Sequence, residues 1–367
     1  MAEKAIRLGG ESTAAAITQA VQELYPEHKF TEAEFARKDN AAEIAVDTNF
    51  AAQSFWKDVR IRFFRKKSAV LGLVMIMIIL LLAIFGPGMN AYTYSGQDLS
   101  QKNFAPRVPG IEQFGILDGS EKMSTTTGTK IVNNYVEKGK DDVYYWFGSD
   151  LYGRDIWTRT WEGARVSLII AVAAAVIDMV IGMSYGLISG YFGGRVDMVM
   201  QRFLEVANGI PRLVIVTLLL LVLQPGMVTI IFALMLTEWV GMSRIARAEM
   251  LKLKDQEFVL ASRTLGAGSF FIIFKEVLPN IIGPIITQVM FSIPTAIFTE
   301  AFLSFVGLGI PVPQCSLGSL ISELYNSFTT HPYQIIPPIV VMSLLMLSFN
   351  LLADGLREAL DPKMKSM

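Results

Sequence analysis

The chain has 367 residues, of which 52% are hydrophobic and 18% are charged, and its formal net charge is −1. Its mean hydropathy of +0.43 is too high for an ordinary soluble domain, and the near-zero net charge gives no support for nucleic-acid binding. A single cysteine, Cys315, excludes an intrachain disulfide and a multi-cysteine metal site.

The first part of the chain is polar. Residues 1–50 are rich in alanine and contain no apolar stretch of the kind that a secretory signal requires. We expect them to belong to a cytoplasmic tail over 1–67, either mobile or folded as amphipathic helices on the inner membrane surface. Basic side chains cluster immediately before the first apolar segment: Lys57, Arg60, Arg62, Arg65, Lys66 and Lys67.

Long apolar segments follow along the rest of the chain. A helix that crosses a bilayer needs about 20 predominantly apolar residues. The sequence contains six segments of about this length and therefore predicts an all-α integral membrane protein with six transmembrane helices. The predicted spans are Ala69–Gly86, Val166–Ser189, Leu204–Leu223, Met227–Ile245, Leu278–Val306 and Ile335–Ala353.

The distribution of lysine and arginine predicts the orientation of these spans. Basic residues gather before the first span, between the second and third, between the fourth and fifth, and after the sixth, whereas 301–334 contains none. Since cytoplasmic loops carry an excess of Lys and Arg, both termini are expected in the cytoplasm. The long segment 88–163 is then an extracytoplasmic insertion between the first two helices, and 355–367 is a cytoplasmic tail.

Three charged residues lie near the end of this insertion, just before the second span. Asp150, Arg154 and Asp155 are candidates for docking an extracytoplasmic protein or for closing an outer gate. The alternative is a local salt-bridged cluster in which Asp150 or Asp155 caps the following helix. Both interpretations stay open on the sequence alone.

Glycine recurs at every fourth residue of the second span, at Gly182, Gly186 and Gly190. Such a repeat is typical of small residues that let a neighbouring helix approach closely. We interpret it as a structural contact between helices rather than as part of a binding site.

Several carboxylates lie inside predicted spans, where an unpaired charge is unfavourable. Asp178, Glu238 and Glu300 should face a polar cavity or a partner, which makes them candidates for a translocation path or gate. The alternative is a helix-packing contact to an arginine or to backbone groups. In the fifth span Pro284 and Pro294 free backbone carbonyls that can line a cavity, and Pro294 joins the candidates for the path.

The segment between the fourth and fifth spans is long and rich in charge, with room for two short helices on the membrane face. Asp255 is a candidate N-cap, and Phe258, Ala261 and Leu265 recur at helical spacing on one face. Gly266 can adopt the left-handed conformation that ends a helix. This shape suits a partner protein that pushes on the membrane helices, and an interfacial helix without a partner is the alternative.

This segment resembles the cytoplasmic EAA loop of ABC-transporter permeases, whose pattern is Glu-Ala-Ala, three residues, Gly, and a later Leu-Pro. Ala261, Gly266 and the pair Leu278-Pro279 match the pattern, while Leu260 stands at the position of the glutamate. The resemblance implies a coupling loop over about 246–277 that receives motion from ATPase subunits. The residues it assigns to ATPase coupling are Leu260, Ala261, Ser262, Arg263, Thr264, Gly266, Leu278 and Pro279.

Further motifs lie along the chain in a fixed order. They are Phe147–Asp155, Gly163–Leu168, Thr299–Gly309 and Phe349–Pro362. The first two resemble the Gly-Thr-Asp-x-x-Gly-Arg-Asp and Gly-Ala-Arg-x-Ser-Leu signatures of the oligopeptide/dipeptide permease subfamily, C-type subunit. The last two resemble the end of the fifth span and the C-terminal end of that subfamily. Together the resemblance covers roughly 55–365.

The resemblance implies the type I ABC importer permease fold, with a first transmembrane helix over 68–87 and a transmembrane domain over 164–354. The implied partners, besides the lipid bilayer, are a second permease subunit (B-type), two ATPase subunits (D- and F-type) and an extracytoplasmic peptide-binding protein. Asp150, Arg154 and Asp155 would then be its docking residues. The chain has no Gly-x-x-x-x-Gly-Lys-Ser/Thr phosphate loop, so ATP and Mg are expected on the ATPase subunits. No cofactor and no enzymatic activity are expected of this chain.

The implied function is that of the membrane-spanning subunit of an ATP-driven importer of oligopeptides or dipeptides, in a bacterial plasma membrane. An importer of nickel complexes, glutathione or another small solute with the same architecture is the first alternative. A secondary transporter or a channel subunit is the second. Secondary transporters usually contain internal repeats, which this sequence does not show, and a channel does not need the large cytoplasmic loop.

Overall fold

The computed structural model of the chain describes residues 55–125 and 128–360. The chain divides into two units, Met1–Lys57 and Asp58–Met367. The architecture described below is that of the second unit.

Both predicted tails lie largely outside the described residues. Of the tail over 1–67, the described part begins with helix α4 (Phe55–Arg65), which is followed at Lys67 by the first membrane helix. At the other end of the chain the last helix continues to Leu360, past the predicted boundary at 354.

Five helices within the described residues are long and apolar enough to cross a membrane. They confirm five of the six predicted spans, and they extend beyond the apolar segments because the helical backbone continues into the polar flanks. The elements are α5 (Lys67–Phe85); α7 (Ile156–Ile177) and α8 (Ser184–Phe192), joined by a π-helical turn; α11 (Met227–Thr237) and α12 (Trp239–Leu253); α14 (Ser269–Phe271) and α15 (Leu278–Leu303), joined by a second π-helical turn; and α17 (Ile336–Leu360).

The third predicted span, Leu204–Leu223, is not one straight helix. The chain forms α9 (Gly194–Gly209) and α10 (Arg212–Val222), which meet at an angle of 77°. Pro211 has no N–H to continue the helical ladder and disfavours the helical conformation of the residue before it. Accordingly, Ile210 is extended, with φ −82° and ψ 123°. The described chain thus has five spans, or six if this bent pair counts as one.

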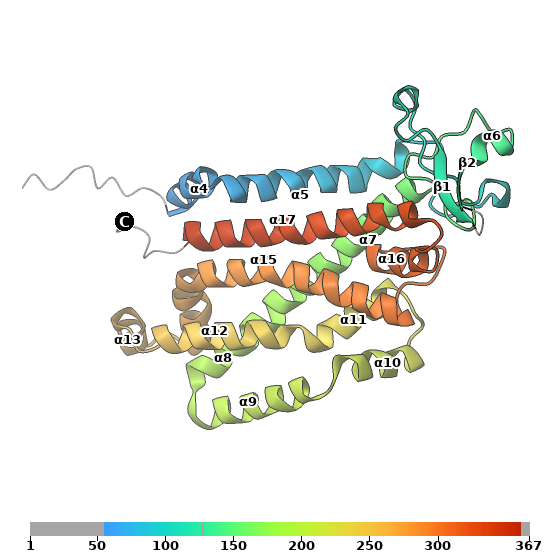
Figure 1. Cartoon of the computed structure of the whole chain (residues 1–367). Helices are drawn as coiled ribbons and strands as arrows, with labels where there is room; N and C mark the ends of the chain where they lie inside the picture. Colours follow the sequence, from blue (N-terminus) through green and yellow to red (C-terminus); the bar gives the residue numbers. More distant parts are fainter. Residues whose placement is uncertain (1–54, 126–127, 361–367) are drawn as a thin grey trace, which may run out of the picture. The chain divides into compact units, whose positions relative to one another are not determined.

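The long helices pack into a bundle in which α5 and α15 both lie against α17, and α12 lies against α15 (Figure 1). Helix α7 crosses them and contacts α5, α15 and α17. The core between them consists of small and branched side chains such as Ala164 and Ala171 of α7, Ile297 of α15 and Leu345 of α17, none more than 1% exposed. In a bilayer such close packing, rather than removal from water, holds helices together.

The glycine repeat of the second span packs directly on α12, as the sequence predicts. A β-carbon added to Gly182, Gly186 or Gly190 would lie within 3 Å of backbone or side-chain atoms of α12. At Gly186 it would lie 2.1 Å from the carbonyl oxygen of Ser243. These three positions let the backbones of α8 and α12, and of the π-helical turn before α8, approach each other.

Replacing Gly186 with alanine is expected to destabilise the protein by about 1–3 kcal/mol, because α8 and α12 must separate to admit the methyl group. The matched control is Gly241→Ala on α12, where the added β-carbon would meet no atom within 4 Å. Alanine favours a helix over glycine, so the control should be neutral or stabilising. Thermal unfolding of the two purified variants in detergent tests this difference, and equal melting temperatures would contradict it.

The insertion between the first two membrane helices contains a small fold of its own. Strands β1 (Ser120–Thr125) and β2 (Gly128–Asn133) form an antiparallel hairpin, followed by the short helix α6 (Asn134–Glu137). The hairpin was not predicted. Beneath it Phe104, Tyr135 and Tyr145 form a buried aromatic cluster.

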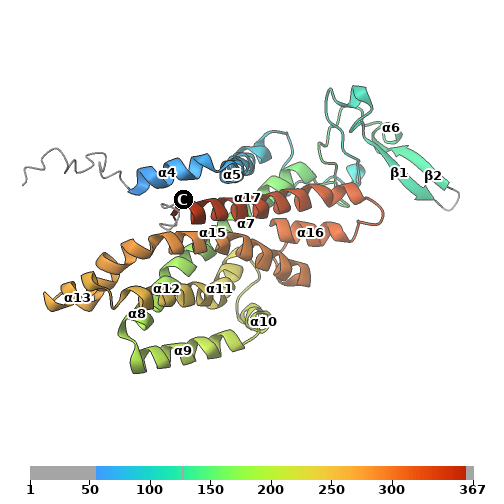
Figure 2. The ribbon, with the colours of Figure 1, turned by 60° about the vertical axis from the view of Figure 1, so that its left-hand side comes forward.

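The two ends of the bundle differ in character. The hairpin and α6 lie at one end, while the short helix α13 (Glu257–Thr264) lies at the other (Figure 2). A further short helix, α16 (Leu317–Tyr325), packs against α7 and α17 at the hairpin end (Figure 1). The insertion and the charged loop therefore occupy opposite ends of the membrane helices, as their predicted placement requires.

Candidate functional site

The charged loop between α12 and α14 contains one separate helix, not two. Helix α13 is the only helix between Leu253 and Ser269. The second predicted helix is instead the beginning of the continuous helical segment Ser269–Leu308, which includes α14 and α15. No break separates it from the membrane helix, because the backbone passes through the π-helical turn Ile272–Val277 without leaving helical geometry.

The C-terminal end of α13 is closed as the sequence predicts. Gly266 has φ +84°, the left-handed conformation that glycine adopts at low cost. The N–H of Gly266 donates to the carbonyl of Arg263 (3.1 Å), and the N–H of Ala267 donates to that of Ser262 (3.0 Å). This pair of bonds is the Schellman motif, which satisfies two carbonyls at the helix end.

The N-terminal end of α13 differs from the prediction. The N-cap residue is Gln256, whose side chain makes no capping hydrogen bond, and not Asp255. The carbonyl of Gln256 accepts the first bonds of the helix, from Val259 and Leu260. The chain passes through a turn at Lys254 and Asp255, so the helix starts one residue later than a carboxylate cap at Asp255 would require.

Helix α13 turns one narrow face to the protein and the rest outward. Val259 is fully buried, in a cluster with side chains of α8, α12 and the Ile272–Val277 turn. Phe258 is 37% exposed and Leu265 88% exposed, and Ala261 between them is also exposed. The predicted apolar face therefore exists, and the protein covers it only in part, at Phe258.

The other assigned coupling residues lie around this face. Leu260 is exposed, Thr264 bonds the carbonyl of Ala261, and the guanidinium of Arg263 lies 5.5 Å from the ring centroid of Tyr191 on α8. Of the remaining residues, Leu278 packs into the cluster around Val259, and Ser262 is half-buried while Pro279 is exposed. All eight residues thus gather at the α13 end of the bundle.

An ion pair that the sequence analysis missed fixes α12 beside α9. Arg247 donates to both carboxylate oxygens of Asp197, at 2.6 and 2.5 Å. The hydroxyl of Ser189 donates to the same carboxylate. Two parallel bonds from a guanidinium fix orientation as well as distance. Because α12 leads directly into the α13 loop, this contact ties that loop to the α8–α9 turn.

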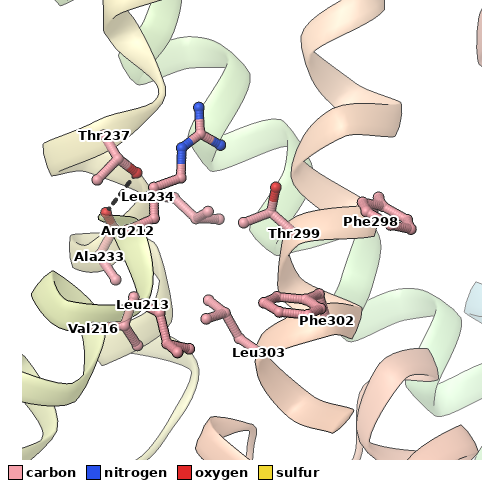
Figure 3. Close-up of a pocket in the computed structure, with 10 residues that line it drawn as sticks. All are labelled: Arg212, Leu213, Val216, Ala233, Leu234, Thr237, Phe298, Thr299, Phe302 and Leu303. Carbon is pink, nitrogen blue, oxygen red and sulfur yellow. Dashed lines mark hydrogen bonds between the residues drawn. The ribbon is translucent and has the colours of Figure 1, made fainter. Parts of the chain in front are cut away.

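A cavity of about 150 Å³ lies between α10, α11 and α15, beside the bend of the broken span. Its polar end carries Arg212 and Thr299, and its wall is apolar, with Leu213, Val216 and Leu303 (Figure 3). Glu238, at the turn between α11 and α12, accepts a hydrogen bond of 2.5 Å from Arg212. Glu238 is thus the one predicted path carboxylate that lies next to this cavity.

Glu300 lies elsewhere, in a cluster of serines. It is fully buried and lies within hydrogen-bond distance of the hydroxyls of Ser316 (2.5 Å), Ser304 (2.7 Å) and Ser167 (3.3 Å). Ser167 belongs to α7, and Ser316 begins α16 as its N-cap. The carboxylate therefore joins three elements through serine hydroxyls, where the sequence suggested an arginine or a backbone group as the partner.

Asp178 and Pro294 are also buried inside the bundle. Asp178 is 2% exposed, opens the π-helical turn between α7 and α8, and accepts a hydrogen bond from Ser292 of α15. Its second oxygen has no hydrogen-bond partner among the described residues. Pro294 lies within α15, which continues as a helix through this proline and Pro284.

The charged residues before the second span form a buried network. Arg154 and Arg159 each bond both Asp150 and Glu323, with distances of 2.7 Å to Asp150 and 2.6 Å from Arg159 to Glu323. Burial alone would raise the pKa of Glu323, but the guanidiniums of Arg159 and Arg154 outweigh it and hold that pKa below its usual range. The network joins the insertion, α7 and α16. Glu323 and Arg159 were not predicted to take part.

Asp155 caps α7, which confirms one of the two sequence interpretations. Its carboxylate accepts a hydrogen bond of 2.8 Å from the N–H of Thr158. Burial raises the pKa of Asp155, although hydrogen bonds from Thr158 and Asn90 oppose the shift. Asp150, Arg154 and Asp155 are at most 2% exposed, so a docked protein cannot touch them directly in this conformation.

Two further polar contacts were not foreseen. His331 lies 2.9 Å from a carboxylate oxygen of Glu121 on β1, which links the hairpin to the segment before α17. Cys315 is buried beside the carbonyl of Arg159, and its burial raises the pKa of the thiol. Within residues 55–125 and 128–360, no three His, Cys, Asp or Glu side chains come together to hold a metal.

Comparison with known proteins shows which families this chain matches. The family described as "Binding-protein-dependent transport system inner membrane component" matches residues 182–366, and "N-terminal TM domain of oligopeptide transport permease C" matches residues 54–106. The match to both regions covers the charged loop, the cavity and the first membrane helix.

Individual relatives agree with the family match. The oligopeptide transport system permease protein OppC of Bacillus subtilis (strain 168) is 41% identical over 85% of this chain and 91% of its own length. The dipeptide transport system permease protein DppC of Lactococcus lactis subsp. cremoris (strain MG1363) is 42% identical over 85% of this chain and 92% of its own length. Among solved structures, a chain of the MetNI methionine ABC transporter in an inward-facing conformation has a TM-score of 0.47 at 15% identity, covering 54% of this chain and 94% of that chain. The chain belongs to the binding-protein-dependent transport system inner membrane components, as an OppC/DppC-type ABC permease that works with ATPase subunits and a binding protein.

Proposed function

We propose that the chain is the C-type permease of an importer that moves oligopeptides or dipeptides delivered by an extracytoplasmic binding protein. Its proposed partners are a B-type permease and two ATPase subunits of the D and F types. The observation that carries this proposal is the largely exposed apolar face at α13, where Leu265, just after the helix, is 88% exposed. The two relatives described above are named as oligopeptide and dipeptide permeases, which supports peptides as the substrate.

The coupling role of α13 follows from how the helix is attached. Val259 is fully buried against α8 and α12, and Arg263 stacks on Tyr191 of α8. Short segments connect α13 to α12 on one side and to Ser269–Leu308 on the other. A push on the exposed face would therefore move these helices together, as a rigid body that switches between inward and outward openings.

The second permease subunit has a suitable surface on α9 and α10. Arg202 and Glu205 of α9 form an exposed ion pair, with side chains 74% and 57% exposed, and Arg212 of α10 is 47% exposed. Glu205 and Arg212 lie inside the third predicted span, and charged side chains in a membrane span face protein or water and not lipid. We propose that the B-type subunit covers this face and that the translocation path passes beside it, next to Glu238. Asp178, Glu300 and Pro294 would shape the path from behind, since they are buried.

The basic residues support an orientation with both termini and α13 in the cytoplasm and the hairpin outside. The binding protein would then meet the hairpin end of the bundle. Asp150, Arg154 and Asp155 would support docking indirectly, by holding the insertion on α7 and α16. The exposed residues of the insertion, such as Phe114 and Ile131, would make the direct contacts.

The test is reconstitution of this chain with its permease, ATPase and binding-protein partners in proteoliposomes. ATP-dependent accumulation of a labelled pentapeptide that requires this chain is the expected result. Stimulated ATP hydrolysis without peptide uptake would redirect the substrate to a nickel complex, glutathione or another solute. Absence of any complex with an ATPase would refute the coupling role of α13.

A further inference from the structure

The polar end of the cavity between α10, α11 and α15 holds an arginine with spare bonding capacity. Arg212 donates one hydrogen bond, from Nη1 to Glu238, and makes no other side-chain hydrogen bond within the described chain. A guanidinium carries five N–H donors in a planar fork. With its side chain 47% exposed, Arg212 retains an edge of this fork for a ligand.

Glu238 holds this arginine in place. Its side chain is only 13% exposed, at the turn between α11 and α12, and the Thr299 hydroxyl lies 3.4 Å from the oxygen that Arg212 contacts. Since the Arg212–Glu238 pair is neutral, the resting cavity carries no uncompensated charge inside the membrane. A second carboxylate can bind the other edge of the guanidinium without displacing Glu238.

The rest of the cavity suits an apolar group. Leu213 and Val216 of α10 and Leu303 of α15 lie on the side away from the guanidinium (Figure 3). A cavity of about 150 Å³ can hold a group of about the size of benzene. An apolar wall with a few convergent polar groups at one end is the usual construction of a small-molecule site.

We propose that this cavity is a subsite for the C-terminal residue of the transported peptide. Arg212 binds the α-carboxylate, Glu238 positions the guanidinium, and the apolar wall receives the last side chain. The inference rests on the proposed peptide-permease function and adds where one end of the peptide binds. Every linear peptide with a free C-terminus offers a carboxylate next to its last side chain. Recognition at the subsite therefore does not depend on the rest of the peptide's sequence.

The neutral pair also keeps the site weak. The carboxylate of Glu238 offsets much of the attraction that a free guanidinium would have for an anion. A site on a translocation path must bind its substrate strongly enough for the substrate to enter, and weakly enough for the substrate to leave. The pairing of Arg212 with Glu238 satisfies both demands.

The experiment uses the complete transporter in proteoliposomes and two labelled pentapeptides of one sequence ending in leucine, one with a free C-terminal carboxylate and one with a C-terminal amide. The ratio of acid to amide uptake by the wild-type protein is the reference for each variant. Arg212→Gln should lower uptake of the acid about tenfold, as expected for loss of a charged hydrogen bond, and lower uptake of the amide much less. Binding protein and ATPase are the same throughout, so their own preferences cancel when variant and wild type are compared.

The matched control is Arg60→Gln on α4, which removes the same charge at an exposed position outside the face assigned to the second permease subunit. Its ratio of acid to amide uptake should equal that of the wild-type protein. A second variant, Val216→Phe, fills the cavity and should slow peptides ending in leucine more than peptides ending in glycine. It also carries the test if Arg212→Gln does not assemble.

Two results would overturn the subsite. They are an equal loss of acid and amide uptake in an assembled Arg212→Gln complex, and an equal effect of Val216→Phe on leucine-ended and glycine-ended peptides. A wild-type transporter that hydrolyses ATP but takes up neither pentapeptide would overturn the peptide-permease function itself. That outcome differs from failure of the subsite, because it is seen in the wild-type transporter before any variant is compared with it.

Discussion

Replacing Gly266 with valine is expected to reduce peptide uptake to the level seen without ATP, while leaving membrane insertion intact. Gly266 has φ +84°, and holding a β-branched residue there costs about 1–3 kcal/mol. Helix α13 spans only Glu257–Thr264, and helices of this length are marginal without tertiary contacts. The strain should therefore unwind the last turn, remove the Schellman bonds and displace Leu265 from the face that the ATPase subunits are proposed to contact.

The neighbouring glycine provides the control for this experiment. Gly268 lies in the same loop with an ordinary φ of −68°, and an added β-carbon would meet no atom within 4 Å at either position. Gly268→Val should therefore retain uptake. The measurement is ATP-driven uptake and ATP hydrolysis by both reconstituted variants. If Gly266→Val transports peptide as well as Gly268→Val does, the coupling role of the α13 cap is wrong.

Replacing Arg159 with methionine is expected to destabilise the protein by about 3–5 kcal/mol, since it removes one partner from a buried charge network. Arg159 is fully buried, with an exposed fraction of 0%. The remaining Arg154 would face two carboxylates, Asp150 and Glu323, and the network would carry an uncompensated negative charge. The insertion, α7 and α16 should then separate more easily.

Two variants separate this effect from a general effect of losing an arginine. The double variant Arg159→Met with Glu323→Gln restores neutrality and should recover part of the lost stability. Arg202→Met breaks an exposed pair and should change stability by less than about 1 kcal/mol. Thermal unfolding in detergent, followed by tryptophan fluorescence, measures all three. A single variant Arg159→Met as stable as Arg202→Met would show that the network does not hold these elements together.

The membrane helices could be predicted because hydrophobicity alone defines them. Hydrophobicity is judged over a long stretch of residues, and this concealed the bend between α9 and α10. Gly209 and Pro211 are nevertheless residues that favour a break in a helix at this point. The end of α13 was predictable for a different reason: a left-handed backbone favours glycine, and Gly266 was the residue available. The start of α13 was one residue off because several polar residues near Asp255 compete for the cap position.

The partners of the charged residues were beyond sequence reasoning. Glu300 meets Ser316 and Ser167, and Arg159 meets Glu323, only because α7, α15 and α16 come together in the folded bundle. No local spacing encodes such contacts. The hairpin Ser120–Asn133 was missed because its residues are mostly polar and lack the alternation that marks a half-buried strand.

The exposed charges of α9 have a consequence for how the cell makes this protein. A newly synthesised chain must bring Arg202 and Glu205 to the membrane before any second subunit covers them. Until that happens α9 carries exposed charges that lipid solvates poorly, so a chain without its partner is expected to be less stable than the assembled pair. Surplus copies should be short-lived, and the lifetime of the chain in vivo should lengthen with the supply of its companion subunit.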